Sequence, residues 1–271
     1  ICSLSSEVII YKGMFLAEQL SSFYPDLLDP DFKSKFAVYH QRYSTNTFPT
    51  WSLAQPFRVL AHNGEINTLK GNLNWMKAHE TRITDDFYGD RVEDLKPILD
   101  SDASDSASLD AAFEILLQTD RSLPMTKSMI IPESWSNNND MPDELKKMYA
   151  YCNAVIEPWD GPAAVCANFG DWIISGMDRN GLRPLRYIIT DDDLLISGSE
   201  VGMVIIDDKN ILKKGRVGPG ELIAINYKEK KFYQSDELKK QLAKQNPYVD
   251  WNKNTILLDE ILDKQSATKP A

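Results

Sequence analysis

The chain has 271 residues, of which 42% are hydrophobic and 26% are charged, so it can bury the core of one large domain or two small ones. No apolar run approaches the roughly 18–20 residues of a spanning helix, which excludes a membrane protein. The net charge of −10 argues against a protein that binds nucleic acid by neutralising its phosphates.

In the first half of the chain, short apolar runs alternate with helical patterns. Residues 36–39 and 58–61 predict strands, and each run leads directly into a polar motif. Residues 69–79, 106–118 and 144–156 have the apolar spacing of amphipathic helices. The strongest of these patterns covers residues 106–118, whose start is crowded with the acidic and hydroxyl side chains that favour a helix N-terminus.

The second half of the chain changes character. From residue 163 to residue 234, short β-rich runs separated by turn residues predict an antiparallel meander. Helices that cover antiparallel sheets around one core belong to the α+β class. We expect residues 1–234 to form the main domain, and the polar residues 235–271 to form a C-terminal helix and an edge or linker towards a next domain.

Metal and nucleotide sites are not predicted. The histidines His40, His62 and His79 share no metal-ligand spacing, and no cysteine lies close enough in sequence to complete a set. The acidic run over residues 100–110 lacks the glycine and the final glutamate of a calcium loop. The sequence contains neither a P-loop pattern nor the GxGxxG pattern of dinucleotide-binding proteins.

Two polar segments follow predicted strands and are candidates for a functional site. In the first, a row of polar side chains over residues 40–47 is poor packing material, although it could also be a solvated turn. In the second, Asn63-Gly64 could be a plain turn or an oxyanion hole, in which a glycine N–H and an asparagine amide act as donors. Asp105, at the start of a predicted helix, could cap that helix or offer its carboxylate to a substrate ammonium.

Several strings together resemble the class II glutamine amidotransferase domains of glutamate synthases. The main one is RYSTNTFPTWSLAQPFRVLAHNGEINTLKGNLNWM (residues 42–76), followed by SDASDSASLDAAFEIL, IEPWDGPAAV and MDRNGLRPLRY. SEVGMV, KKGRVGPGEL and KQNPYVDW continue the resemblance, which covers essentially the whole chain in order.

The resemblance implies a fold and a reaction. The fold is that of the N-terminal-nucleophile hydrolases, a four-layer α/β/β/α sandwich of antiparallel sheets, here lacking its first strand or strands. The implied reaction hydrolyses L-glutamine and passes ammonia to the synthase and central domains of the same polypeptide, where 2-oxoglutarate becomes glutamate. FMN and an iron–sulfur cluster are implied for those later domains, with a small NAD(P)H-oxidising subunit or ferredoxin as electron donor. No cofactor or metal is implied for this chain, and the expected compartment is the cytoplasm or a plastid.

The resemblance also assigns roles to single residues. Arg42 is expected to bind the substrate α-carboxylate and Asp105 the α-amino group, while Asn63 and Gly64 form the oxyanion hole. The segment after Arg42 is expected to be a lid over the ligand, and its residues are Ser44, Thr45, Asn46 and Thr47.

The family nucleophile is an N-terminal cysteine, and none of the three cysteines here matches it. Cys2 lies in ICSLSSEVIIYKG, a context that resembles an internal strand of the family. Cys152 and Cys166 lie in a helical and an apolar segment and are interpreted as ordinary core thiols. Three cysteines without CxxC spacing also indicate a reducing compartment. We therefore expect the chain to be a processed or excised piece, inactive without its nucleophile.

Two other functions remain open at this point. One is another class II amidotransferase, of the phosphoribosyl-pyrophosphate type, against which the strings TNTFPTW and EPWDGPA argue. The other is a non-catalytic, amidotransferase-like binding module that has lost its nucleophile. Retention of Arg42, Asn63, Gly64 and Asp105 together argues against a pure scaffold.

Overall fold

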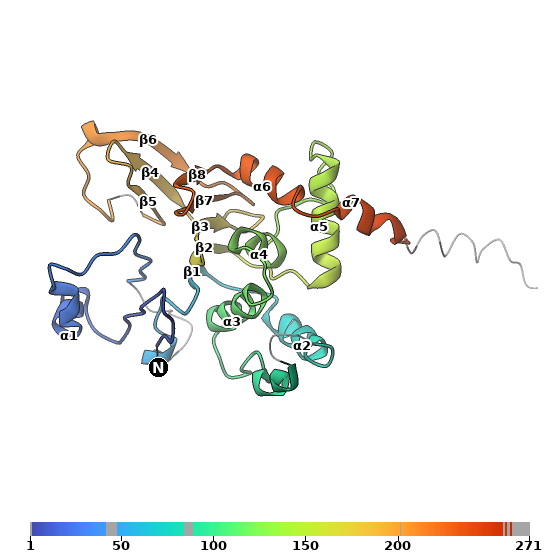
Figure 1. Cartoon of the computed structure of the whole chain (residues 1–271), viewed down its shortest axis with the longest axis horizontal. Coiled ribbons are helices and arrows are strands. Elements are labelled where there is room, and N and C mark those ends of the chain that lie inside the picture. Colours follow the sequence, from blue (N-terminus) through green and yellow to red (C-terminus); the bar gives the residue numbers. More distant parts are fainter. Residues whose placement is uncertain are drawn as a thin grey trace, which may run out of the picture.

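The structure is a computed structural model that describes residues 2–41, 48–83, 89–200, 202–256, 258 and 261. The described residues form a five-stranded sheet and a three-stranded sheet with helices packed on the larger sheet (Figure 1). The architecture is therefore α+β, as predicted. No helix among the described residues is long and apolar enough to cross a membrane.

The larger sheet has the strand order β1-β2-β3-β7-β8 and the smaller has the order β5-β4-β6. Every neighbouring pair whose register is resolved is antiparallel, which confirms that part of the predicted meander. The meander is split, however, because β7 rather than β4 pairs with β3. The strands are β1 (Leu60–Gly64), β2 (Ala163–Phe169), β3 (Trp172–Met177), β4 (Arg186–Thr190), β5 (Leu195–Gly198), β6 (Ile211–Arg216), β7 (Leu222–Asn226) and β8 (Lys231–Tyr233).

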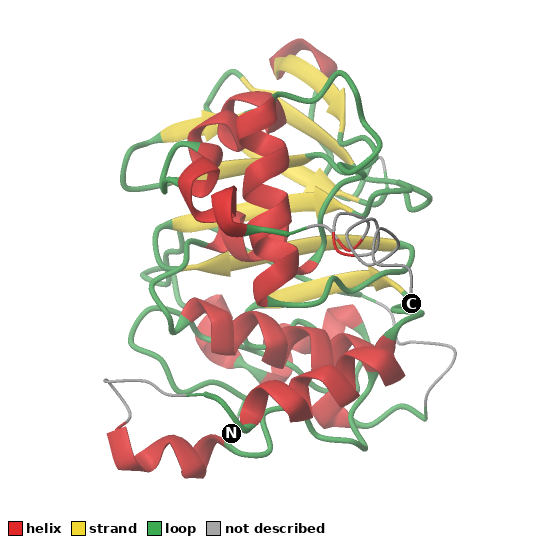
Figure 2. Cartoon of the chain, turned by 90° about the vertical axis from the view of Figure 1, so that its right-hand side faces the viewer, coloured by secondary structure: helices red, strands yellow, loops and turns green. Residues whose placement is uncertain are grey.

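Except for α1, which lies apart in the N-terminal arm (Figure 1), the helices pack on one face of the larger sheet, and several of them lie in front of the strands in Figure 2. The three predicted amphipathic helices are confirmed as α2, α3 and α5. An additional helix, α4, is not predicted from the sequence, because its 8 residues are shorter than the roughly 11–18 residues over which a helical period is recognised. The helices are α1 (Leu20–Phe23), α2 (Leu69–Glu80), α3 (Asp105–Leu117), α4 (Leu123–Ile130), α5 (Asp143–Val155), α6 (Ser235–Ala243) and α7 (Tyr248–Trp251).

Two hydrophobic clusters explain the layers. Alternate residues of β2 point to opposite faces of the sheet: Val165 packs in the cluster beneath the helices, whereas Ala164 packs in the cluster towards the smaller sheet. The described residues thus stack helices, the larger sheet and the smaller sheet in that order (Figure 1). One helical layer and two antiparallel sheets packed face to face correspond to three of the four layers of the predicted α/β/β/α sandwich.

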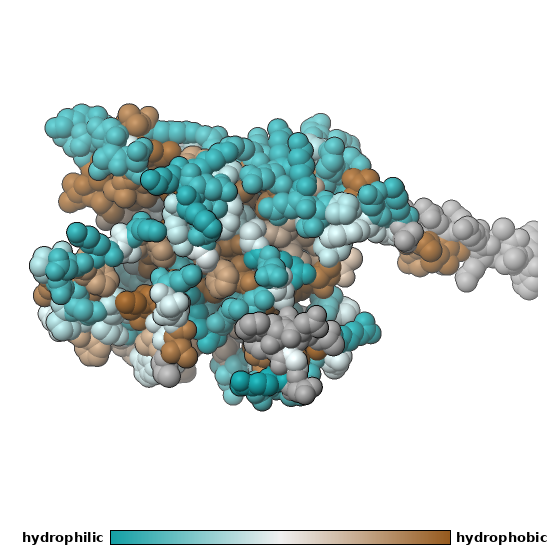
Figure 3. Space-filling model, in the orientation of Figure 1, coloured by the Kyte–Doolittle hydropathy of each residue, from teal (hydrophilic) through white to brown (hydrophobic). Residues whose placement is uncertain are grey.

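The N-terminal arm, residues 2–41, is packed very differently. Ile10 is the buried hydrophobic side chain of the described arm, while Leu4, Ile9 and Phe23 are largely exposed. Hydrophobic side chains accordingly lie on the surface at the left of Figure 3, in the region of the arm and of the smaller sheet. The strand predicted over residues 36–39 is wrong: this segment has no regular structure, because no described strand pairs with it.

Candidate functional site

Helix α3 holds strand β1 at both of its ends through two carboxylates. At the start of the strand, Asp110 is 3% exposed, and its oxygens accept from the backbone N–H groups of Arg58, Val59 and Leu60 at 2.9–3.1 Å. Burial raises the pKa of Asp110, although these backbone hydrogen bonds act in the opposite direction. Both oxygens of this carboxylate are occupied by backbone N–H donors, so Asp110 has a structural role.

At the other end of β1, the carboxylate of Asp105 accepts fewer hydrogen bonds than that of Asp110. Its Oδ2 accepts from the backbone N–H of Ile66 at 2.8 Å, and its Oδ1 lies 3.4 Å from the Ser106 hydroxyl. The N-cap of α3 is Ser104, whose hydroxyl accepts from the N–H of Ala107. Asp105 is therefore not the capping residue, and its half-buried carboxylate can accept further donors.

The outer edge of β1 carries a row of backbone N–H groups that point away from β2. Leu60 N–H donates to Asp110, His62 N–H donates to the Gln55 side chain at 2.6 Å, and Ile66 N–H donates to Asp105. Alternate residues of a strand point the same way, so Gly64 N–H belongs to this row. No described residue accepts from it. It is an open donor between two satisfied ones.

The register with β2 supports this orientation of Gly64. Its register partner, Ala163, uses both its N–H and its carbonyl in hydrogen bonds with Asp178, on the side away from β1. The next residue, Glu65, donates its N–H to the carbonyl of Pro162 at 3.0 Å. The strand thus bonds to β2 on either side of Gly64 but not at Gly64 itself.

Gly64 and Gly161 let two backbone segments approach each other closely. A Cβ on Gly64, at φ +155°, would lie 1.8 Å from the Pro162 carbonyl oxygen. A Cβ on Gly161, at φ +156°, would lie 1.9 Å from the Glu65 carbonyl oxygen. Only glycine fits at either position, so the end of β1 at Asn63-Gly64 is fixed against the loop before β2.

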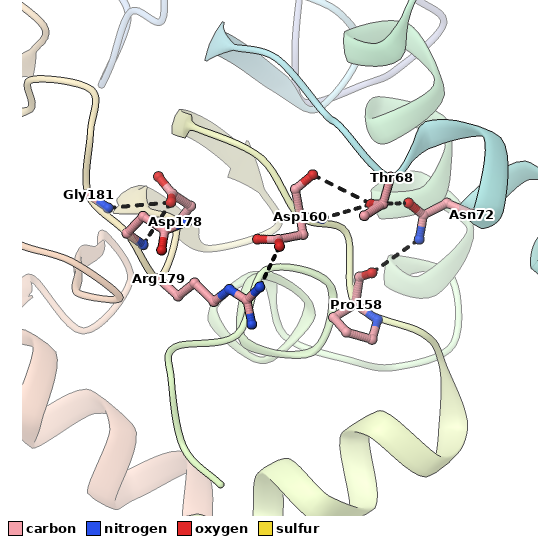
Figure 4. Close-up of polar contacts among 8 residues, drawn as sticks. Thr68, Asn72, Pro158, Asp160, Asp178, Arg179 and Gly181 are labelled. Carbon is pink, nitrogen blue, oxygen red and sulfur yellow. Dashed lines mark hydrogen bonds and ion pairs between the residues drawn. The ribbon is translucent and has the colours of Figure 1, made fainter. Parts of the chain in front are cut away.

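Hydrogen bonds and an ion pair connect three loops at this end of the sheet (Figure 4). The Thr68 hydroxyl accepts from the N–H of Asp160 at 3.0 Å and donates to Asn72, whose amide donates to the Pro158 carbonyl. On the other side, Arg179 forms an ion pair of 2.5 Å with the Asp160 carboxylate. These contacts set the loop after β1 in a fixed position relative to the loops before β2 and after β3.

Buried Asp178 strengthens this frame. Its Oδ1 accepts from the N–H of Ala163, and its Oδ2 accepts from the N–H groups of Asn180 and Gly181. Behind it, the amine of Lys127 is 1% exposed and donates to the Met177 carbonyl at 2.7 Å. Burial lowers the pKa of Lys127 to about 7. Neither Asp178 nor Lys127 was predicted as a site residue, because the hydrophobic pattern of the sequence does not indicate that Lys127 is buried.

The structure brings three of the predicted site residues to one end of β1: Asn63, Gly64 and Asp105. The Asn63 side chain makes no hydrogen bond to any described residue, so its amide is available as a donor. The remaining predicted residues lie outside the described part of the chain, and these are Arg42, Ser44, Thr45, Asn46 and Thr47. His62 and Ser106, which were not predicted to take part, form a hydrogen bond of 2.7 Å beside the site.

The cysteines do not form a nucleophilic or metal-binding centre in the described part of the chain. Burial raises the pKa of Cys152 to about 12 and also raises the pKa of Cys166, so both remain protonated thiols. Cys2 lies in the N-terminal arm, near the Lys12 amine. No group of histidines, cysteines and carboxylates among the described residues could hold a metal ion.

Comparisons with known proteins match this chain to the class-II glutamine amidotransferases and to glutamate synthases. Residues 1–251 match the sequence model of the class-II glutamine amidotransferases. The chain is 57% identical over 266 residues to the glutamate synthase [NADPH] large chain of Azospirillum brasilense, which covers 98% of this chain and 18% of the relative. It is 41% identical over 271 residues to the glutamate synthase [NADH] of Saccharomyces cerevisiae, covering 100% of this chain and 12% of the relative.

The chain thus spans less than a fifth of the length of these relatives. Among solved structures, the glutamine phosphoribosylpyrophosphate amidotransferase of Bacillus subtilis aligns with 72% of this chain and 34% of its own, at 19% identity and a TM-score of 0.37.

Proposed function

Because the chain belongs to the class-II glutamine amidotransferase family, we propose that it is the glutamine-hydrolysing part of a glutamate synthase. It would bind L-glutamine, release ammonia from the side-chain amide, and pass that ammonia to the synthase and central domains of the same polypeptide. There, 2-oxoglutarate would be converted to glutamate.

The observation that carries this proposal is the open donor pair at the end of β1. The N–H of Gly64 has no described acceptor, and the amide of Asn63 next to it makes no described hydrogen bond. When a nucleophile attacks the glutamine amide, the carbonyl oxygen becomes an oxyanion, and two preorganised donors stabilise that charge. Since backbone donors are seldom left open in a folded protein, this pair supports an oxyanion hole better than a plain turn.

Substrate recognition would use charges at both ends of the glutamine backbone. The Oδ2 atom of Asp105 accepts from the backbone N–H of Ile66, and the remaining acceptor capacity of the carboxylate would bind the α-ammonium. Arg42 would bind the α-carboxylate, since a planar guanidinium fixes a carboxylate in two contacts. Ser44, Thr45, Asn46 and Thr47 would cover the bound ligand as a lid that excludes water.

The nucleophile and the redox groups would come from elsewhere in the complete protein. The buried thiols of Cys152 and Cys166 are protonated and unsuited to attack an amide. These cysteines also do not provide the grouped thiolates that an iron–sulfur cluster needs, and no such metal-binding group occurs among the described residues. FMN and the cluster would therefore be held by the later domains, with NAD(P)H or ferredoxin as electron donor.

We further propose that residues 235–271 form a C-terminal helix and an edge of the main domain that leads towards the next domain. Within this segment, α6 packs its buried residues Leu238 and Leu242 against the helical layer. The reducing compartment indicated by free cysteines would be the cytoplasm or a plastid.

The test uses the full-length protein that contains this chain. Glutamate formation from 2-oxoglutarate is measured with glutamine and, separately, with free ammonia, which bypasses the glutamine site. Arg42→Lys should raise KM for glutamine by about tenfold or more and leave the ammonia-driven rate unchanged. Arg58→Lys is the matched control, because Arg58 pairs with Glu114 at the opposite end of β1. A full-length protein that releases no glutamate from glutamine would overturn the proposal.

A further inference from the structure

His62 lies directly before the two open donors, but its side chain points to the other side of the strand. Its register partner Val165 belongs to the cluster beneath the helices, so the imidazole faces α3. The ring is 2% exposed, and its Nδ1 lies 2.7 Å from the Ser106 hydroxyl oxygen. The Nε2 atom is buried and has no hydrogen-bond partner among the described residues.

Burial decides the protonation state of the ring. Burial lowers the pKa of His62 to about 4; Asp105 and Asp178 act to raise it, while Arg183 and His40 lower it further. The imidazole is therefore neutral at neutral pH and carries one N–H.

The position of that proton follows from the neighbours of Ser106. A serine hydroxyl has one proton, and the Asp105 carboxylate 3.4 Å away can only accept it. If Ser106 donates to Asp105, its oxygen accepts from His62, which places the ring proton on Nδ1. The bare lone pair then falls on Nε2, whereas the other tautomer would bury an N–H donor without an acceptor. The resulting order of donation is His62 to Ser106 to Asp105.

We propose that His62 is a positioning residue that, through Ser106, orients the Asp105 carboxylate towards the substrate ammonium. Asp105 is then held by two contacts that both come from the β1 segment: directly by Ile66 N–H and indirectly by His62. The strand that carries Asn63 and Gly64 thereby also fixes the group that binds the far end of the glutamine. The Ser106–Asp105 contact is long, so the short His62–Ser106 bond is the stronger link. This inference rests on the proposed function.

The decisive comparison is between glutamine and glutaramate, the same amide without the α-amino group. Asp105 matters only for glutamine, so a fault in its orientation lowers kcat/KM for glutamine and spares glutaramate. In the full-length protein, Ser106→Ala should lower the glutamine-to-glutaramate ratio of kcat/KM by about two- to twelvefold. The loss should be mainly in KM, because an ammonium contact is present before and during the reaction.

Two substitutions of His62 separate its ring nitrogens. In His62→Asn the amide stands near the position of Nδ1, and in His62→Gln it stands near that of Nε2. We expect His62→Gln to reproduce the loss seen with Ser106→Ala and His62→Asn to keep a ratio close to wild type. Ammonia-driven glutamate formation reports the fold of each variant, and Ser106→Ala provides the test where a His62 variant does not fold.

The outcomes distinguish the two proposals. If wild-type protein hydrolyses glutamine but the Ser106→Ala variant loses glutamine and glutaramate activity equally, His62 and Ser106 merely support the fold and the inference is wrong. An unchanged ratio in both Ser106→Ala and His62→Gln also overturns it. If the wild-type protein hydrolyses neither substrate, the proposed function itself fails.

Discussion

The two ends of β1 are held by the same helix and by the same type of residue, yet they differ in how fully their polar groups are paired. At the start of the strand, the Asp110 carboxylate is buried and accepts three backbone N–H groups. At the end of the strand, Asp105 accepts one at close range, and Gly64 N–H beside it has no described acceptor.

This difference supports our proposal that Asp110 has a structural role and that Asp105 binds substrate. Backbone donors and acceptors in a folded protein are normally paired. A carboxylate whose oxygens already accept from several backbone N–H groups is therefore not free to bind a ligand. A carboxylate that can accept further hydrogen bonds, next to donors without an acceptor, can bind a molecule that carries both a positive charge and a carbonyl oxygen. The distinction depends on hydrogen-bond geometry, since both residues are aspartates of α3.

The largest expected effect is at the open end. In the full-length protein, Asn63→Ala should lower kcat for glutamine by about 10²–10³-fold, because the lost amide donor would stabilise charge that develops only in the transition state. Steady-state kinetics with glutamine and with ammonia measure this. Asn67→Ala, at an exposed asparagine in the following loop, serves as the matched control. A normal kcat with only a raised KM would show that Asn63 is not part of an oxyanion hole.

The closed end should respond in stability instead. Asp110→Ala leaves three backbone N–H groups without their acceptor and should lower the free energy of unfolding of this chain by about 3 kcal/mol. Denaturant titration measures it. The control is Asp102→Ala, at an exposed aspartate before α3, which should change stability by less than about 0.5 kcal/mol. Equal effects of the two substitutions would refute the structural role of Asp110.

Much of this arrangement could be predicted from the sequence, and the exceptions have physical causes. Amphipathic periods and turn residues located α2, α3, α5 and nearly all the strands, because each buries one face. Helix α4 was missed because its 8 residues are shorter than the roughly 11–18 residues over which a helical period is recognised. The segment 36–39 was predicted as a strand from its composition, but a strand also needs a partner, and the described sheets provide none.

The site was predictable in part for a similar reason. The resemblance to the amidotransferase family pointed to Asn63, Gly64 and Asp105. That Gly64 N–H is the open member of its row follows only from the pairing register with β2. The link from His62 through Ser106 joins residues 44 positions apart and leaves no signal in a single sequence.

The next prediction tests whether Asp105 is free to bind a cation. Asp105→Asn keeps an oxygen for the Ile66 N–H but removes the negative charge, so stability should hardly change. The KM for glutamine should rise by about 10- to 150-fold, the value of a hydrogen bond to a charged group. Kinetics of the full-length protein measure the rise. If the same substitution clearly lowers the free energy of unfolding but leaves the KM for glutamine normal, Asp105 has the same structural role as Asp110 and the two ends of β1 are alike.

The smallest effect concerns pH, where the two ends should have opposite signs. For His62 the folded-state pKa is lowered to about 4 from the usual 6.5, so below pH 6.5 the unfolded chain binds a proton that the folded chain excludes. Stability is therefore lost as pH falls from 6.5 towards 4, by about 1 kcal/mol between pH 6.5 and pH 5.5.

Burial raises the pKa of Asp110 instead, so its contribution to stability increases as pH falls through that pKa. Unfolding free energies of this chain, measured from pH 7 to pH 4.5, should thus show a smaller acid loss for His62→Gln than for wild type. Parallel curves for wild type and His62→Gln would mean that the buried ring takes up its proton in the folded state, and that burial does not keep it neutral.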